Sequence, residues 1–216
     1  MRQSLGKGFL GTCYLALSVQ AKLFEWGKCE GLSVVDEVPG TVCGNFSVPL
    51  DYTNESSNET IILELAKVPA TNPEPYLGSI LLNFGGPGGA GRQGLLLLGR
   101  HLQELSGGHH DLLVFDPRGT GTTFPFSCYP RTEAGRARRT QNAARAWDGV
   151  SSSDTATDTL WGMAGVIDHT CKLNENATEV GQLIGTGFFV RDMMQIVDAL
   201  QEEEGEDGML RYWGEY

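Results

Sequence analysis

The feature that most constrains the fold is the apolar run SILLNF at residues 79–84, which is followed at once by five glycines within residues 85–91. The run is apolar enough to predict a strand buried on both faces of a sheet. The leucine-rich segment 95–105 then predicts a helix, and the apolar run 111–115 predicts another buried strand. Strand, helix and strand in this order predict a parallel sheet and an α/β fold.

Other segments add elements to the same sheet. Residues 61–68 predict one more strand, whereas residues 22–60 are expected to be rich in loops. Apolar residues at helical spacing over 189–200 predict an amphipathic helix, followed by a turn at 202–208 and a strand at 210–213. Because no repeat or linker divides the chain, we expect one domain at residues 22–216.

Composition excludes one class of partner. The chain has 216 residues and a formal net charge of −11, and nucleic acid is therefore not expected as a partner, since phosphate binding requires a basic surface. Five arginines gather in residues 131–145. We interpret this segment as a solvated helix or loop rather than an anion site.

The first 21 residues resemble a secretory signal peptide. Arg2 and Lys7 give a positive start, an apolar stretch follows at residues 9–19, and Ala21 offers a small residue for cleavage. The stretch is too short to span a membrane, which takes about 20 apolar residues. A buried N-terminal helix is the alternative.

Asparagine sequons and cysteines also favour secretion. Candidate N-glycosylation sites are Asn45, Asn54, Asn58 and Asn176. Cys13 would leave with the signal peptide, and an even set suited to two disulfides would remain: Cys29, Cys43, Cys128 and Cys171. Proximity in the sequence favours Cys29–Cys43 and Cys128–Cys171, although four cysteines allow three pairings. No C-x-x-C spacing is present, so we expect no metal site.

The glycine-rich loop has two functional interpretations. Gly86, Gly88 and Gly91 form a G-x-G-x-x-G pattern, and Glu104 lies near the distance expected of a ribose-binding acid in a dinucleotide-binding oxidoreductase. However, Pro87 removes one backbone N–H from such a cradle. The alternative is an oxyanion loop, in which backbone N–H groups stabilise the charge that develops on a carbonyl oxygen during acyl transfer.

Several motifs together resemble one family. They are Val48-Pro-Leu-Asp-Tyr52, the segment Ser79–Gly91, Phe115-Asp-Pro-Arg-Gly-Thr-Gly121 and Tyr212-Trp-Gly214. In order and spacing they resemble the secreted tripeptidyl aminopeptidase-like α/β hydrolases, which are relatives of proline iminopeptidase. The resemblance runs from about Trp26 to Gly214. It implies an α/β-hydrolase fold, an oxyanion loop at Gly85 and Gly86, no cofactor, and a peptide or small ester as substrate.

The resemblance also implies a nucleophile elbow, Gly-x-Ser-Tyr-Gly, after the strand at 210–213. Gly214 would be its first glycine and Glu215 its variable position, but Tyr216 stands where the serine is expected. In the family the acid and the histidine follow the serine, whereas the histidines of this chain all precede it: His101, His109, His110 and His169. We therefore expect an α/β-hydrolase domain truncated before its nucleophile and inactive by itself.

The strand at 210–213 is expected to be central in the family fold, so a chain that stops there would leave an apolar strand without a partner. This favours truncation over the second hypothesis, a non-catalytic binding or decoy protein that ends at Tyr216. The third hypothesis is the dinucleotide-binding oxidoreductase.

Overall fold

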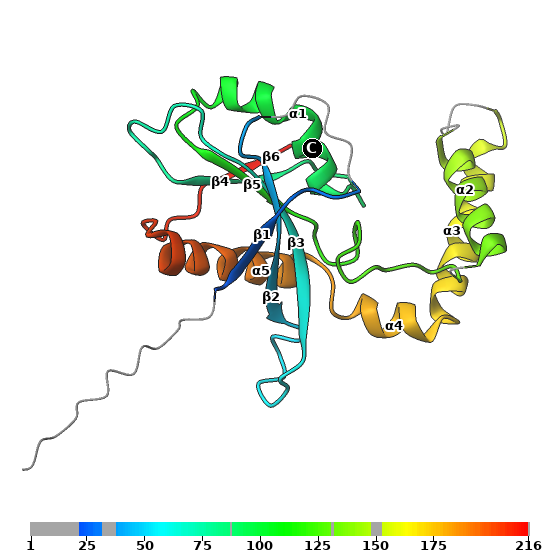
Figure 1. Cartoon of the computed structure of the whole chain (residues 1–216). Coiled ribbons are helices and arrows are strands. Elements are labelled where there is room, and N and C mark those ends of the chain that lie inside the picture. The colour runs from blue at the N-terminus through cyan, green and yellow to red at the C-terminus, as the bar shows by residue number, and fades with distance from the viewer. Residues whose placement is uncertain (1–21, 32–37, 87, 131, 148–152, 216) are drawn as a thin grey trace, which may run out of the picture.

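A computed structural model describes most of the chain (Figure 1). The described residues are 22–31, 38–86, 88–130, 132–147 and 153–215. The expected signal peptide at residues 1–21 and the expected nucleophile position, Tyr216, lie outside them.

Four strands open the chain, and four successive helices separate the last two strands. The strands are β1 (Phe24–Gly27), β2 (Val42–Pro49), β3 (Thr60–Val68), β4 (Ser79–Asn83), β5 (Asp111–Phe115) and β6 (Tyr212–Gly214). The helices are α1 (Gly91–Leu105), α2 (Glu133–Trp147), α3 (Ala156–Lys172), α4 (Glu175–Gly181) and α5 (Thr186–Ala199), which continues into a π-helical turn, η1 (Leu200–Glu204).

The strands form one mixed six-stranded sheet in the order β1-β2-β3-β5-β4-β6. Strands β5, β4 and β6 are parallel, as expected, but β1, β2, β3 and β5 pair in antiparallel fashion. The parallel pairs agree with the prediction from the sequence, which did not include the antiparallel part of the sheet; the segment 22–60, expected to be rich in loops, contains two of its strands, β1 and β2. In β2 the side chains of Cys43, Phe46 and Val48 are buried while those between them are largely exposed, which is the alternation of a half-buried strand.

Two further boundaries differ from the predictions. The last strand begins at Tyr212 rather than at residue 210, and residues 202–204 belong to η1 rather than to a turn. The arginine-rich segment lies largely within α2, but α3 and α4 were not predicted. In α3 polar and apolar side chains are mixed and mostly exposed, and α4 has only seven residues, so hydrophobic periodicity gave no signal for either helix.

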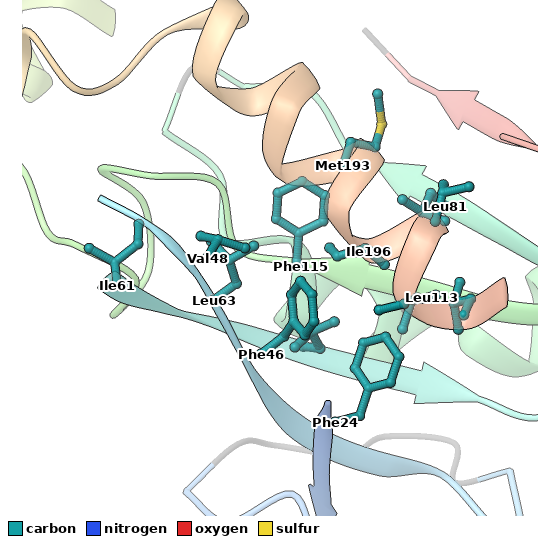
Figure 2. Close-up of a cluster of buried hydrophobic side chains, with 14 residues drawn as sticks. Phe24, Phe46, Val48, Ile61, Leu63, Leu81, Leu113, Phe115, Met193 and Ile196 are labelled. Carbon is teal, nitrogen blue, oxygen red and sulfur yellow. The ribbon is translucent and has the colours of Figure 1, made fainter. Parts of the chain in front are cut away.

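Helices cover both faces of the sheet, and each face has its own hydrophobic cluster. On one face α5 packs Met193, Ile196 and Val197 against side chains such as Leu113 and Phe115 of β5 (Figure 2). On the other face α1 packs Leu95, Leu96 and Leu102 against β3, β4 and β5. This two-sided burial explains why the runs at 79–83 and 111–115 are continuously apolar.

Two glycines let α1 approach the sheet closely. A Cβ on Gly91 would collide with Cγ2 of Val114, and a Cβ on Gly94 would lie 2.8 Å from the ring of Phe84. The glycines of this segment therefore serve helix packing as well as the loop, and they place the N-terminus of α1 directly against the end of β5.

Three glutamates in and directly after η1 connect the segment to three strands of the sheet. The carboxylate of Glu203 accepts hydrogen bonds from the backbone N–H groups of Leu23 and Phe24, and Glu204 pairs with Lys67 of β3 at 2.8 Å. Glu206 accepts from the backbone N–H of Ser79, at the start of β4, at 3.0 Å. The segment 202–208, which the sequence predicts to be a turn, thus makes specific contacts with three strands.

Helices α2, α3 and α4, which we call the helical unit (residues 133–181), stand to one side of the sheet (Figure 1). A disulfide between Cys128 and Cys171 ties this unit to the loop after β5, and a second disulfide joins Cys29 to Cys43. Both pairings favoured by sequence proximity are confirmed.

Three of the candidate glycosylation sites have exposed side chains, namely Asn45 on β2 and Asn54 and Asn58 in the loop between β2 and β3. Asn176 lies on α4. Their glycosylation stays a prediction. In the part of the chain that the structure describes, no helix is both long and apolar enough to cross a membrane.

Candidate active site

A pocket of about 270 Å³ lies at the carboxyl ends of β4 and β5, beside the glycine-rich loop. From β4 the chain passes through α1 to β5 on one side, and it later returns to place β6 on the other side of β4. Open α/β sheets bind their ligands at such a change of direction, outside the carboxyl ends of the strands. The pocket is lined by Asn83, Gly85, Gly88, Gly89, Pro117, Arg118, Thr120, Gly185, Thr186 and Phe189.

The loop needs glycine for its backbone conformation. Gly85 and Gly86 have φ angles of 68° and 149°, and a Cβ on Gly86 would lie 2.8 Å from the backbone nitrogen of Gly88. The N–H of Gly85 donates to Oδ1 of Asn83 at 3.0 Å. The N–H of Gly86 donates to no group among the residues that the structure describes. Of the two expected oxyanion donors, Gly86 is therefore the one whose N–H makes no hydrogen bond to the described residues, although Gly85 rather than Gly86 lines the pocket.

The end of β6 lies next to this loop. Strands β4 and β6 run parallel, and the backbone N–H of Glu215 donates to the carbonyl of Asn83 at 2.8 Å. Neighbouring strands are about 4.8 Å apart. The end of β6 therefore lies next to the end of β4, and the glycine-rich loop begins two residues after Asn83.

The loop after β5 forms another side of the pocket and is fixed by Asp116. This carboxylate is buried and accepts hydrogen bonds from the backbone N–H and the Nε of Arg92, both at 3.0 Å. Arg92 in turn pairs with Glu64 of β3. Because a Cβ on Gly121 would collide with Oδ2 of Asp116, the loop folds tightly over this ion pair.

A second buried ion pair anchors the same loop to α5. The guanidinium of Arg118 makes a two-pronged contact with Asp192, at 2.7 and 2.8 Å, and it also donates to the carbonyls of Pro49 and Leu50. The hydroxyl of Tyr52 donates to Asp192 at 2.7 Å, and the Arg118 guanidinium lies 5.2 Å from the centre of the Tyr52 ring. Every carboxylate oxygen is satisfied, as a buried charge requires.

The surroundings of Tyr52 favour its neutral form. Burial raises the pKa of the phenol well above its ordinary value, and the hydrogen bond to Asp192 raises it further. Tyr52 therefore stays a hydrogen-bond donor at neutral pH. Arg118, Asp192 and Tyr52 position the wall of the pocket, and Arg118 itself lines it.

The sequence singled out the segments that hold Tyr52 and Arg118, but not the role of these residues or of Asp192. Asp192 is a fully buried polar side chain on the apolar face of α5, between Phe189 and Ile196. An acidic residue at a core-facing position is a signal for a buried cation partner.

The histidines lie away from the pocket. His109 and His110 precede β5, so the length of that strand, roughly 17 Å, separates them from the loop after β5. His101 lies in α1 and His169 in α3. The structure thus places none of them beside the glycine-rich loop.

The geometry argues against a dinucleotide site. Glu104 lies in the last turn of α1, about 20 Å along the helix from the glycine-rich loop. It is exposed there, and it cannot reach a ribose whose phosphates sit at that loop. Among the described residues, no three His, Cys, Asp or Glu side chains are grouped to hold a metal ion.

The chain is similar in sequence to several proteins named as hydrolases. The chain is 29% identical over 192 residues to the serine protease Hip1 of Mycobacterium tuberculosis, an alignment that covers 88% of this chain and 34% of that protein. It is 32% identical over 129 residues to the putative hydrolase YuaR of Escherichia coli, covering 54% of this chain and 25% of the relative. It is 31% identical over 102 residues to carboxylesterase B of Mycobacterium tuberculosis, covering 46% and 19%.

The chain is similar to serine hydrolases. No profile of an established protein family matches it. The chain spans about a third of the length of the first of these relatives. The mixed sheet flanked by helices is compatible with the α/β fold expected from the sequence, and the disulfides agree with the expectation of an extracellular protein.

Proposed function

We propose that this chain is the N-terminal part of a secreted serine hydrolase, in which the glycine-rich loop supplies the oxyanion-binding N–H groups. The nucleophile would follow β6, and the acid and the histidine would come from the remainder of a longer protein. The reaction would form an acyl-enzyme, with Gly86 as one donor to the oxyanion. By itself the 216-residue chain is then expected to be inactive.

The observation that carries this proposal is the hydrogen bond between the N–H of Glu215 and the carbonyl of Asn83, at 2.8 Å. It aligns the exit of β6 with the exit of β4, beside the N–H of Gly86. An acyl-transfer site needs a nucleophile and oxyanion donors within about 3 Å of one reacting carbonyl. Similarity to a serine protease, a putative hydrolase and a carboxylesterase supports the same chemistry.

We further propose that the substrate is a peptide and that short peptides or single residues are released from free N-termini. Small esters are the alternative substrate class. Support comes from the motifs at residues 48–52, 79–91 and 115–121, which resemble secreted aminopeptidases. Peptides with free and with acetylated N-termini distinguish the two modes, since only an exopeptidase loses its activity on acetylation.

The test of the oxyanion role is Gly86→Ala in the full-length protein. An added Cβ would push against the backbone nitrogen of Gly88, 2.8 Å away, and would shift the N–H of residue 86. Loss of one oxyanion donor lowers kcat by about 10²- to 10³-fold, and KM is expected to change little.

The matched control is Gly162→Ala on α3, where an added Cβ meets nothing within 4 Å. It is expected to leave kcat unchanged. Equal kcat values for the parent protein and the Gly86 variant would contradict the proposed role of the loop.

A further inference from the structure

A second, larger cavity lies outside the candidate active site. It is an open groove of about 1030 Å³ between residues 124–130 and the helical unit. Its lining includes Phe124, Cys128, Tyr129, Arg138, Leu173 and Val180. A concave surface of this size with mostly apolar and aromatic walls is typical of a ligand site.

The walls of the groove are fixed in place by covalent and hydrogen bonds. The disulfide between Cys128 and Cys171 joins one wall to α3. The side chain of Asn142 on α2 donates to the hydroxyl of Tyr129 at 2.6 Å, and Asn174 donates to the carbonyl of Ser127 at 3.4 Å. The groove is therefore formed before any ligand arrives, which lowers the entropy cost of binding.

The groove and the candidate active site share the same two chain segments. Arg118 and Thr120 line the pocket, and residues 124, 125 and 127–130 of the same loop line the groove. On the opposite side, the groove is lined by Leu173, Asn174 and Val180, and the pocket is lined by Gly185, Thr186 and Phe189. The segments touch between these points, since a Cβ on Gly119 would lie 3.5 Å from Ile184. The pocket and the groove are therefore neighbours along the same pair of segments.

Charge indicates what the groove prefers. Among the described residues that line it, Arg138 is the charged side chain. It lies on α2 next to Arg139, in a protein whose formal net charge is −11. A guanidinium forms strong paired hydrogen bonds with a carboxylate. The groove therefore favours an acidic ligand although the protein as a whole repels one.

We propose that this groove binds an extended peptide that carries a carboxylate, held by Arg138, while the rest of the peptide leads toward the glycine-rich loop. This proposal rests on the proposed function in one respect only, namely that the bound peptide is a substrate. Binding itself needs no nucleophile, because the groove and Arg138 lie within the described chain. In this arrangement Arg138 selects substrates at a distance from the bond that is cleaved.

The test measures binding to the full chain with its disulfides intact. The probe is a peptide of about twelve residues with a free N-terminus and fluorescein on a C-terminal lysine, which would span some 40 Å when extended. It carries two glutamates near one end, and a matched peptide carries glutamines instead. Fluorescence anisotropy should show tighter binding of the glutamate peptide.

Arg138→Gln should abolish this preference and weaken binding of the glutamate peptide by about fivefold, as expected for a partly exposed ion pair. Arg139→Gln is the matched control and should keep the preference, because Arg139 is not among the lining residues. Both side chains are exposed, so neither change should alter the unfolding midpoint.

The walls give a second test. Replacing Cys128 and Cys171 with serine should weaken binding of both peptides, whereas replacing Cys29 and Cys43, whose disulfide joins β2 to the chain that follows β1, should not. Equal binding of the two peptides to the parent chain would overturn the proposal. So would equal losses in the two arginine variants, or a dimer that Arg138→Gln dissociates, since the occupant would then be a second copy.

Failure of this proposal is distinguishable from failure of the proposed function. Selective peptide binding without any labelling of the full-length protein by a serine-directed probe would support the peptide-binding groove and contradict the proposed hydrolase function. Labelling without selective binding does the reverse.

Discussion

Two regions of the molecule are stabilised by different interactions. One is the sheet with the helices α1 and α5 that cover it, and the other is the helical unit. Around the sheet, apolar side chains fill both faces, and two buried ion pairs, Arg118–Asp192 and Arg92–Asp116, fix the loop after β5. The helical unit exposes large apolar side chains instead, with Trp161 83% and Leu173 72% exposed, and a disulfide ties it to the rest of the chain. The comparison indicates a rigid frame around the candidate active site and a helical unit of lower stability beside it.

The largest expected loss of stability follows from the removal of one charge of a buried ion pair. Asp192→Asn leaves the Arg118 guanidinium buried without its counter-charge, and loss of one partner of a buried pair costs about 3–5 kcal/mol. The free energy of unfolding in urea measures this loss. In the helical unit the exposed pair of Asp168 and Lys172 provides the control, and Asp168→Asn should change that free energy by no more than about 0.5 kcal/mol. Similar losses in the two variants would mean that burial does not separate the two regions.

An apolar truncation sharpens the same contrast. Ile196 is fully buried on the α5 face of the sheet, so Ile196→Ala should lower the free energy of unfolding by about 2–5 kcal/mol. Val166 on α3 is 62% exposed, and Val166→Ala should cost less than about 0.5 kcal/mol. A large loss from Val166→Ala would show that another surface covers the helical unit.

Removal of the Cys128–Cys171 disulfide should act mainly on the helical unit. A bridge that closes a loop of 43 residues contributes about 2–4 kcal/mol. Hydrogen exchange should become faster in α3 and α4 of the Cys128→Ser, Cys171→Ser variant and stay slow in β3 and β5. If exchange quickened equally throughout, the two regions would unfold as one.

The smallest expected effect concerns Tyr52. Tyr52→Phe removes one hydrogen bond to Asp192 and should cost about 1 kcal/mol at neutral pH. Because the pKa of Tyr52 is raised above its ordinary value of 10.0, the folded state keeps the phenol proton where the unfolded state loses it. Stability should therefore fall as the pH rises above that value, and more steeply in the parent than in the variant.

Some of the slope above that pH should remain in the Tyr52 variant. Burial also raises the pKa of Tyr76, which lies in the loop before β4 and donates to Glu206. Urea titrations at several alkaline pH values measure both slopes. Identical slopes in parent and variant would contradict the assignment of Tyr52.

The sequence predicted the parts of the fold that local pattern determines. Continuous apolar runs identified β4 and β5, helical spacing identified α5, and proximity identified both disulfides. It failed at β1 and β2, because short alternating strands among turn residues resemble loops until their partners are known. It also failed at α3, whose exposed apolar residues give no consistent face, and at α4, which is too short to show a helical period.

The candidate site was predicted in part for a similar reason. Five glycines after a strand identify the loop, since few other structures require them. The sequence does not indicate which N–H is hydrogen-bonded. In the structure the side chain of Asn83 accepts from the N–H of Gly85 but not from that of Gly86. The partner of Arg118 lies 74 residues further along the chain, and nothing in the local sequence indicates such a contact.

The central claim is that an acyl-transfer nucleophile emerges beside the glycine-rich loop, directly after β6. The most direct measurement is to label the secreted, full-length protein with a fluorophosphonate probe and to locate the labelled residue by peptide mass spectrometry. We predict a labelled serine in the peptide that continues from Tyr212-Trp-Gly-Glu215, and no labelling of the 216-residue chain alone. Labelling of a serine elsewhere, or no labelling of the full-length protein, would contradict the account.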